Sequence, residues 1–121
     1  MLIGDYLRRS AIHFPQMEAL KQGNRVFTYR ELNGRVNRLA HGLLKIGVKK
    51  GDRIAVLLHN CMEQMEIYFA CAKTGIIFIP INNLLRQSEL RFAFDYVTPR
   101  GLFLDLEFEK LGVKIGAVTT K

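Results

Sequence analysis

The side chains that could carry out chemistry are concentrated in three short segments, each of which follows an apolar run. They are His59, Asn60 and Cys61, then Asn82 and Asn83, and finally Asp105. A histidine in this setting could act as a general base or as a ligand. His59 has no carboxylate at a recognisable spacing, so we interpret it as a loop histidine.

The neighbouring polar and sulfur-containing residues also have structural explanations. Asn60 precedes a helical pattern and is expected to cap that helix, although a cap could also contact a substrate. Asn82 follows Pro80 closely, and we favour a turn residue over a residue that supports a site. Met62 and Met65 have helical spacing, so they are expected in the core rather than in an acyl-chain pocket.

Sequence patterns that would bind phosphate or metal are absent. Gly42 and Gly47 have the glycine spacing of a P-loop, but Val48 replaces the required lysine and the segment is helical in pattern. No G-x-G-x-x-G motif occurs. Cys61 and Cys71 lack the spacing of a zinc site and are expected to be free thiols in a reducing cytosol. We therefore predict no catalytic residue and no metal site, and we assign no cofactor-binding residue.

The tract from 27 to 58 predicts the helix and strand that come before the first of these segments. Thr28 and Glu31 have the spacing of a capping box, and Phe27 and Leu32 have that of a hydrophobic staple. Apolar residues then recur at three- and four-residue steps, which predicts an amphipathic helix. This stripe consists of Leu32, Val36, Leu39, Leu43 and Ile46.

The end of this helix leads into a turn and a buried strand. Gly47 occurs where a left-handed C-cap is needed, and Val48 can fold back onto the last turn. Residues 49–52, Lys-Lys-Gly-Asp, form the expected turn. Residues 54–58 are a continuous apolar run of strand length.

A helix and a hairpin are expected before this tract. Residues 2–13 predict the helix, which Pro15 ends. Residues 18–21 and 25–28 flank a Gly-Asn pair, which predicts a short hairpin.

Two further helix and strand pairs are expected after the tract. The first helix begins at Asn60 and ends at Gly75, and residues 76–79 form its strand; the second begins at Ser88 and precedes a strand at 102–104. The expected buried stripe of the first helix is Met62, Met65, Phe69 and Ala72, and that of the second is Leu90, Phe94 and Val97.

This order, β-α-β-α-β, favours parallel strands with right-handed crossovers. We predict an α/β fold: part of a three-layer sandwich, with a mainly parallel sheet flanked by helices and a short amino-terminal hairpin. A chain of 121 residues has room for one core but for fewer strands than a doubly wound domain usually needs. Residues 1–121 are therefore expected to form one unit, the first part of a larger domain.

The formal charge of +7 comes from 18 basic and 11 acidic side chains, which raises the question of an anionic partner. The basic residues are scattered with no run longer than two, so we interpret them as solvated helix faces and expect no nucleic-acid partner. No apolar run approaches the ~20 residues of a membrane span, and the amino end lacks the apolar core of a signal peptide. We expect no transmembrane segment and a cytoplasmic location.

The tract from 27 to 58 resembles the AMP-forming acyl-CoA synthetase and adenylation-domain superfamily, which has a similar T-Y-x-E-L-N…G-D-R-V-A block. Residues 67–75 and 78–82 are similar to its F-F-A-x-x-K-A-G and V-P-x-N elements, and residues 2–20 to the leading helix and turn of its fatty acyl-CoA ligase branch. The resemblance covers residues 2 to 104. The family more often has proline at the position of His59, so no role is transferred to that loop.

The resemblance implies the amino-terminal scaffold of a long-chain fatty acid–CoA ligase. Such an enzyme joins a fatty acid or another carboxylate to coenzyme A through an acyl-adenylate, using ATP and Mg²⁺. The family's Ser/Thr/Gly-rich ATP loop and the lysine of its lid do not occur in these 121 residues. We therefore expect the chain alone to be inactive and to act together with the remainder of the enzyme.

Two alternatives from other functional classes remain. A small basic module could bind nucleic acid through its helix backs, and oligonucleotide retention at low ionic strength would favour it. A partner-binding domain could instead use exposed sheet edges, including for self-association. Self-association that disappears in the presence of the remaining enzyme would identify the exposed edges as a result of truncation.

Overall fold

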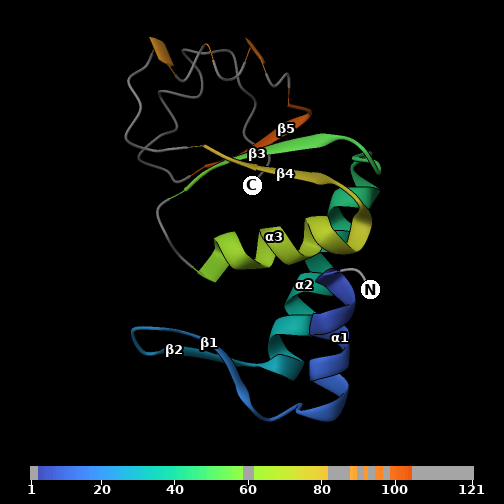
Figure 1. The fold of residues 1–121 in the computed structure, drawn as a ribbon, viewed down its shortest axis with the longest axis vertical. Helices are drawn as coiled ribbons and strands as arrows, with labels where there is room; N and C mark the ends of the chain where they lie inside the picture. Colours follow the sequence, from blue (N-terminus) through green and yellow to red (C-terminus); the bar gives the residue numbers. More distant parts are fainter. Residues whose placement is uncertain are drawn as a thin grey trace.

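The computed structural model describes residues 3–58, 62–81, 88–89, 92, 95–96 and 99–104. The order of elements along the chain is helix, hairpin, helix, and then strands with a helix between the first two (Figure 1). Their bounds are α1 (Ile3–His13), β1 (Glu18–Gln22), β2 (Arg25–Thr28), α2 (Tyr29–Lys45), β3 (Arg53–Leu57), α3 (Met62–Thr74), β4 (Ile77–Pro80) and β5 (Gly101–Leu104).

Strands β3, β4 and β5 form a parallel sheet in the order β4-β3-β5. Val56 of the central strand lies opposite Pro80 on one side and Phe103 on the other. Strands β1 and β2 form a separate antiparallel hairpin at the other end of the molecule (Figure 1). The predicted mainly parallel sheet and amino-terminal hairpin are both confirmed.

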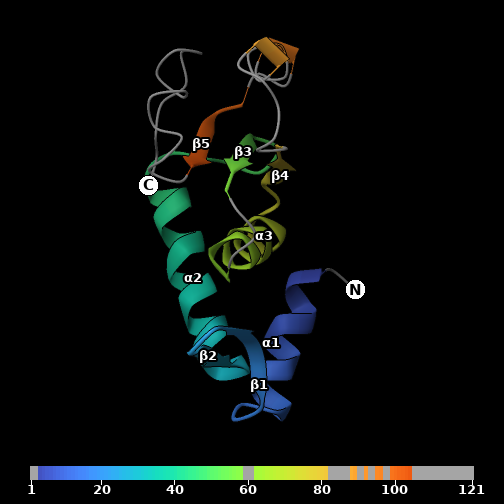
Figure 2. The ribbon, with the colours of Figure 1, turned by 90° about the vertical axis from the view of Figure 1, so that its left-hand side faces the viewer.

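Helical segments lie on two sides of the parallel sheet. Helix α3 runs along one side, next to α2, whereas the described helical residues between 88 and 96 lie on the opposite side (Figures 1 and 2). Ser88, where the third helix was predicted to begin, is helical. The predicted stripe of that helix, Leu90, Phe94 and Val97, lies outside the described residues.

Helix α2 begins with the predicted capping box. The Thr28 hydroxyl accepts a hydrogen bond from the Glu31 backbone N–H at 3.2 Å, and the Glu31 carboxylate accepts one from the Thr28 N–H at 2.9 Å. These bonds satisfy backbone donors that have no partner within the helix. Phe27 and Leu32 belong to the same hydrophobic cluster, as a staple requires.

The helix ends in a Schellman motif centred on Gly47, whose φ is 101°. The Gly47 N–H donates to the Leu44 carbonyl and the Val48 N–H to the Leu43 carbonyl, both at 3.1 Å. Val48 is buried, so it does fold back onto the core. The following turn is closed by the Lys49 N–H, which donates to the Asp52 carboxylate at 2.8 Å.

The buried face of α2 agrees with the predicted stripe except at its end. Leu32, Val36 and Leu43 are buried, Leu39 is partly buried, and Ala40 joins them. Ile46 is 62% exposed, so its predicted burial was wrong. It is the C-cap residue, where the chain leaves the helix, and Val48 is buried instead.

The predicted stripe of α3 was only partly right. Its buried residues are Met62, Glu66, Ile67, Ala70 and Cys71. Met65 is 39% exposed and Phe69 and Ala72 are only partly buried. Helix α3 packs against α1, α2 and the sheet at once, so tertiary contacts rather than one amphipathic stripe determine which side chains are buried. The described helices are too short or too polar for a membrane span.

Replacing Thr28 tests the capping box. Thr28→Ala removes the hydroxyl acceptor and should lower the free energy of unfolding by about 1 kcal/mol, measured by urea denaturation. Thr28→Ser retains the hydroxyl and should lose much less. Equal losses in the two variants would show that the methyl group, not the cap, stabilises this position.

Candidate functional site

The carboxyl ends of the three parallel strands lie side by side. Leu57 is in register with Leu104, and the Ile81 N–H donates to the Val56 carbonyl at 2.8 Å. We refer to the place where the chain leaves these strands, at Leu58, Ile81 and Leu104, as the carboxyl edge. Ligands of open parallel sheets bind beyond such an edge.

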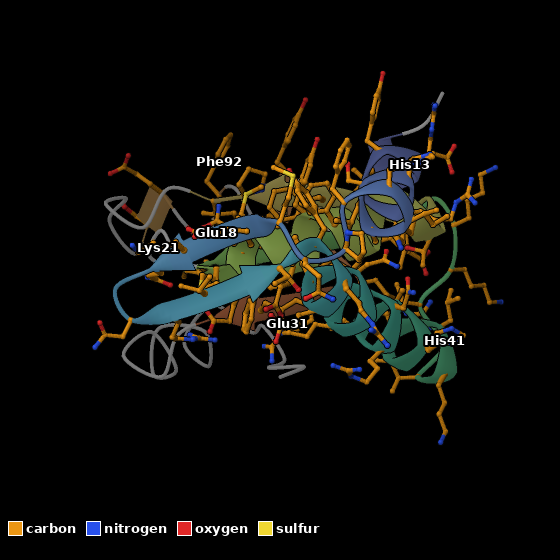
Figure 3. All side chains as sticks on the ribbon, turned by 90° about the horizontal axis from the view of Figure 1, so that it is seen from below. His13, Glu18, Lys21, Glu31, His41 and Phe92 are labelled. Atoms are coloured by element: carbon orange, nitrogen blue, oxygen red, sulfur yellow. The ribbon has the colours of Figure 1, made fainter. Side chains whose placement is uncertain are left out.

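All of the predicted candidate residues of this edge follow these three positions directly. They are His59, Asn60, Cys61, Asn82, Asn83 and Asp105, and they lie outside the described residues. Their proposed roles therefore stay predictions. The other two histidines, His13 and His41, are exposed on α1 and α2 (Figure 3).

The amino end of α3 is held by the hairpin. The Met62 N–H, in the first turn of α3, donates to the side-chain Oε1 of Gln22 at 3.0 Å. Gln22 is the last residue of β1. Asn60 was the predicted cap of this helix, and the structure adds a cap from a residue far away in sequence.

A second contact from the hairpin reaches the next residue of α3. The Arg25 guanidinium forms an ion pair with the Glu63 carboxylate at 2.6 Å. It also lies 5.6 Å from the centroid of the Phe27 ring. Both partners are partly exposed, with side-chain exposures of 48% and 34%, so the pair is expected to contribute little energy by itself.

The most buried charge of the described chain is Glu66, which is 7% exposed. Arg35 of α2 binds its carboxylate through two hydrogen bonds, of 2.7 and 3.2 Å. The bond to Glu66 is the main reason that the pKa of Arg35 is raised, against the opposing effect of burial. The Arg35 guanidinium also lies 4.5 Å from the Phe27 ring centroid. We call Arg25, Phe27, Arg35, Glu63 and Glu66 the ionic network.

An open cavity of about 220 Å³ lies beside this network, between α2, α3 and the sheet. Its walls include Leu58 at the carboxyl edge and Phe103 of β5. The charged groups in its wall are Arg35, Glu63 and Glu66, which pair within the network. The first cavity is therefore largely apolar, and the charged groups in its wall are paired within the ionic network. A second cavity, of about 250 Å³, lies between α1, β1 and α3 and is also mostly apolar.

Lys73 joins α3 to α2. Its Nζ donates to the Oδ1 atoms of Asn33 and Asn37, the latter at 2.7 Å. Burial and the nearby charge of Arg8 lower its pKa, whereas Asp5 acts in the opposite direction. Because the ammonium is committed to two amides, Lys73 acts as a connection between helices.

Cys71 is the cysteine in the described part of the chain, and its environment suppresses the reactivity of its thiol. The thiol is free, buried and 1% exposed. Burial raises its pKa from 9.0 to about 11, so the reactive thiolate is scarce at neutral pH. Within the described ranges, no cluster of three His, Cys, Asp or Glu side chains could hold a metal ion.

The residues of the ionic network and Gln22 were not identified as a unit from sequence. Arg35 was assigned to a solvated helix face, and Gln22 and Glu66 were given no role. Their partners are 31 to 40 positions away along the chain. No local pattern encodes a contact at such a separation. The available signal was a glutamate at position 66 between two residues of the predicted buried stripe, Met65 and Phe69.

The chain matches the family model described as AMP-binding enzyme over residues 7–119. Acyl-CoA ligase sidI of Aspergillus fumigatus is 35% identical over 105 residues, which cover 84% of this chain and 18% of that protein. Feruloyl-CoA synthase of an Amycolatopsis species is 41% identical over 91 residues, which cover 75% and 18%. Among solved structures, the N-terminal domain of FACL13 from Mycobacterium tuberculosis has a TM-score of 0.91 at 28% identity, covering 99% of this chain and 31% of that one.

The chain therefore spans 18% of the length of these two curated relatives.

The Arg35–Glu66 pair can be tested by double substitution. Glu66→Ala should lower the free energy of unfolding by roughly 2 kcal/mol, less than for a fully buried pair because the Arg35 side chain is 36% exposed. Replacing both residues by methionine should cost less, because no charge is left unpaired beside the apolar wall. Glu63→Ala is the matched control and should cost under about 1 kcal/mol. Urea denaturation that shows a larger loss in the double variant would contradict this account.

The protection of Cys71 can be measured in a Cys61→Ser background. We expect iodoacetamide to leave the native chain unmodified at pH 8 and to alkylate it in urea. Because the pKa is higher in the folded state, the contribution of the thiol to stability is fully present below pH 9 and is lost as pH rises to about 11. Rapid native alkylation at pH 8, followed by mass spectrometry, would refute the assignment of Cys71 as an inert core residue.

Proposed function

Since the chain belongs to the AMP-binding enzyme family, we propose that it forms the first part of the large domain of an AMP-forming acyl-CoA ligase. The observation that carries this proposal is the family match over residues 7–119 together with the parallel sheet and its carboxyl edge. The acyl substrate would be a fatty acid or another carboxylate. Acyl-CoA ligase and feruloyl-CoA synthase among the relatives support this substrate class.

The described residues do not fit as holders of ATP, Mg²⁺ or coenzyme A. The cavity beside the carboxyl edge has largely apolar walls; its Arg35 pairs with Glu66, and its Glu63 pairs with Arg25. Phosphate binding requires backbone N–H groups and cations that are free to face the ligand. We propose that the remainder of the enzyme supplies these groups and that this part supplies the strand ends and the helix on which the site is built.

Three of the basic side chains are paired within the chain, which weighs against the alternative of a basic nucleic-acid module. Arg25, Arg35 and Lys73 are each bound to a carboxylate or an amide of the same chain. A surface that binds the nucleic-acid backbone needs cations that face outward toward its phosphates. A cytoplasmic location is part of the proposal and is supported by the free thiol of Cys71.

Two proteins test the proposed function. The 121-residue chain should show no carboxylate-dependent exchange between pyrophosphate and ATP, because it has no phosphate loop. A chimera in which this chain replaces the corresponding segment of the feruloyl-CoA synthase should retain feruloyl-CoA formation within about tenfold, because the two sequences are 41% identical over 91 residues.

Intact feruloyl-CoA synthase is the positive control for both measurements. Exchange by the 121-residue chain above a buffer blank would overturn the scaffold role. A chimera that folds, as judged by circular dichroism, but makes no product would count against the family function.

A further inference from the structure

We infer that the β1–β2 hairpin sets the position of α3 at the carboxyl edge, and that Gln22 and Arg25 are positioning residues for the site. The inference rests on the proposed function, because it assigns a role at the edge where that function would be carried out. It concerns two contacts that join segments about 40 positions apart in sequence. The hairpin and the amino end of α3 point to the same side of the molecule (Figure 1).

The Gln22 contact supplies a tertiary cap. The first four backbone N–H groups of a helix have no partner inside it, and a start that is not capped frays. Here the Met62 N–H donates to the Gln22 side chain. A local cap would stabilise the helix without locating it, whereas a cap from the hairpin also fixes the helix start relative to another element.

The Arg25 contact also restricts the orientation of the start of α3. Glu63 is next to Met62, so the two hairpin residues bind consecutive positions of α3 from adjacent ends of β1 and β2. Two contacts restrict rotation of the helix start as well as its displacement. Glu63 is also in the first turn, where the helix dipole favours a negative charge.

A third contact continues this arrangement one turn later. Glu66 lies four residues after Met62 and binds Arg35, whose guanidinium covers the Phe27 ring of β2. The amino half of α3 is thus held by polar contacts to the hairpin and α2. Its carboxyl half is held by burial of Ala70 and Cys71 in the hydrophobic cluster and by the hydrogen bonds of Lys73 to α2.

Two fixed points determine the geometry at this part of the carboxyl edge: the end of β3 and the start of α3. Residues 54–58, which include most of β3 and the residue after it, are all buried. The start of α3 at Met62 is the other fixed point, and the hairpin contacts hold it. A change in the hairpin is therefore expected to alter binding at an edge to which the hairpin contributes no strand.

Amide hydrogen exchange of the 121-residue chain tests the hold on α3. Gln22→Ala should speed exchange of the Met62, Glu66 and Ile67 amides about fivefold, the effect of losing one cap, and leave residues 70–73 unchanged. Arg25→Ala should speed the same amides less, about twofold, because its ion pair with Glu63 is partly exposed. Gln22→Glu retains the acceptor and should restore the slow rate. Lys21→Ala is the matched control, because Lys21 is an exposed residue of the same strand (Figure 3).

Equal acceleration along the whole of α3, or none at Met62, would overturn the inference.

The chimera with the feruloyl-CoA synthase tests the consequence for the site. In it, Gln22→Ala should raise KM for the carboxylate roughly three- to tenfold while kcat changes less than about twofold, because binding geometry rather than a reacting group is altered. An active chimera with unchanged KM overturns the positioning role. Inactivity of the unsubstituted chimera would count against the proposed function instead, and the exchange rates would then decide the inference.

Discussion

Complete burial of the central strand is the constraint on which the rest of the structure depends. Residues 54–58 are all buried, which is possible only if both strand edges are paired and both faces are covered. Strands β4 and β5 pair with the two edges of β3, and α2 and α3 share a hydrophobic cluster with one face of it. Parallel neighbouring strands require long crossover connections, usually helices, between them. Burial of this one short strand therefore calls for the helices that connect and cover the sheet, and it places the carboxyl ends of the strands at one edge.

The polar contacts act on this apolar framework by orienting its helices. Burial is non-directional, so it holds α3 near the sheet without defining the rotation or the start of the helix. The Arg35–Glu66 and Arg25–Glu63 pairs and the two amides bound by Lys73 supply that direction. A buried ion pair contributes modest net stability, and its better-supported role is to specify one arrangement. The hairpin, although separate from the sheet, takes part in the architecture through these contacts.

The distribution of chemistry in the chain agrees with a scaffold. In the described part, the titratable groups with altered pKa values are a paired arginine, a lysine bound to two amides and a buried thiol. None of these three groups is both exposed at the carboxyl edge and without a hydrogen-bond partner within the chain. Under the proposed function, the chain would contribute strand ends and a positioned helix, and the reacting groups would come from the remainder of the enzyme.

The sequence by itself determined the local elements: the capping box at Thr28, the Schellman motif at Gly47, the hairpin around Gly23 and the apolar strands. Each is encoded within a few consecutive residues, where backbone geometry and hydrophobic period act directly. Only the tertiary structure decided that Met65 is exposed, that Glu66 is buried, and that Gln22 caps α3. These outcomes depend on which surfaces meet across 30 or more positions, and hydrophobic period carries no information about a partner at that distance.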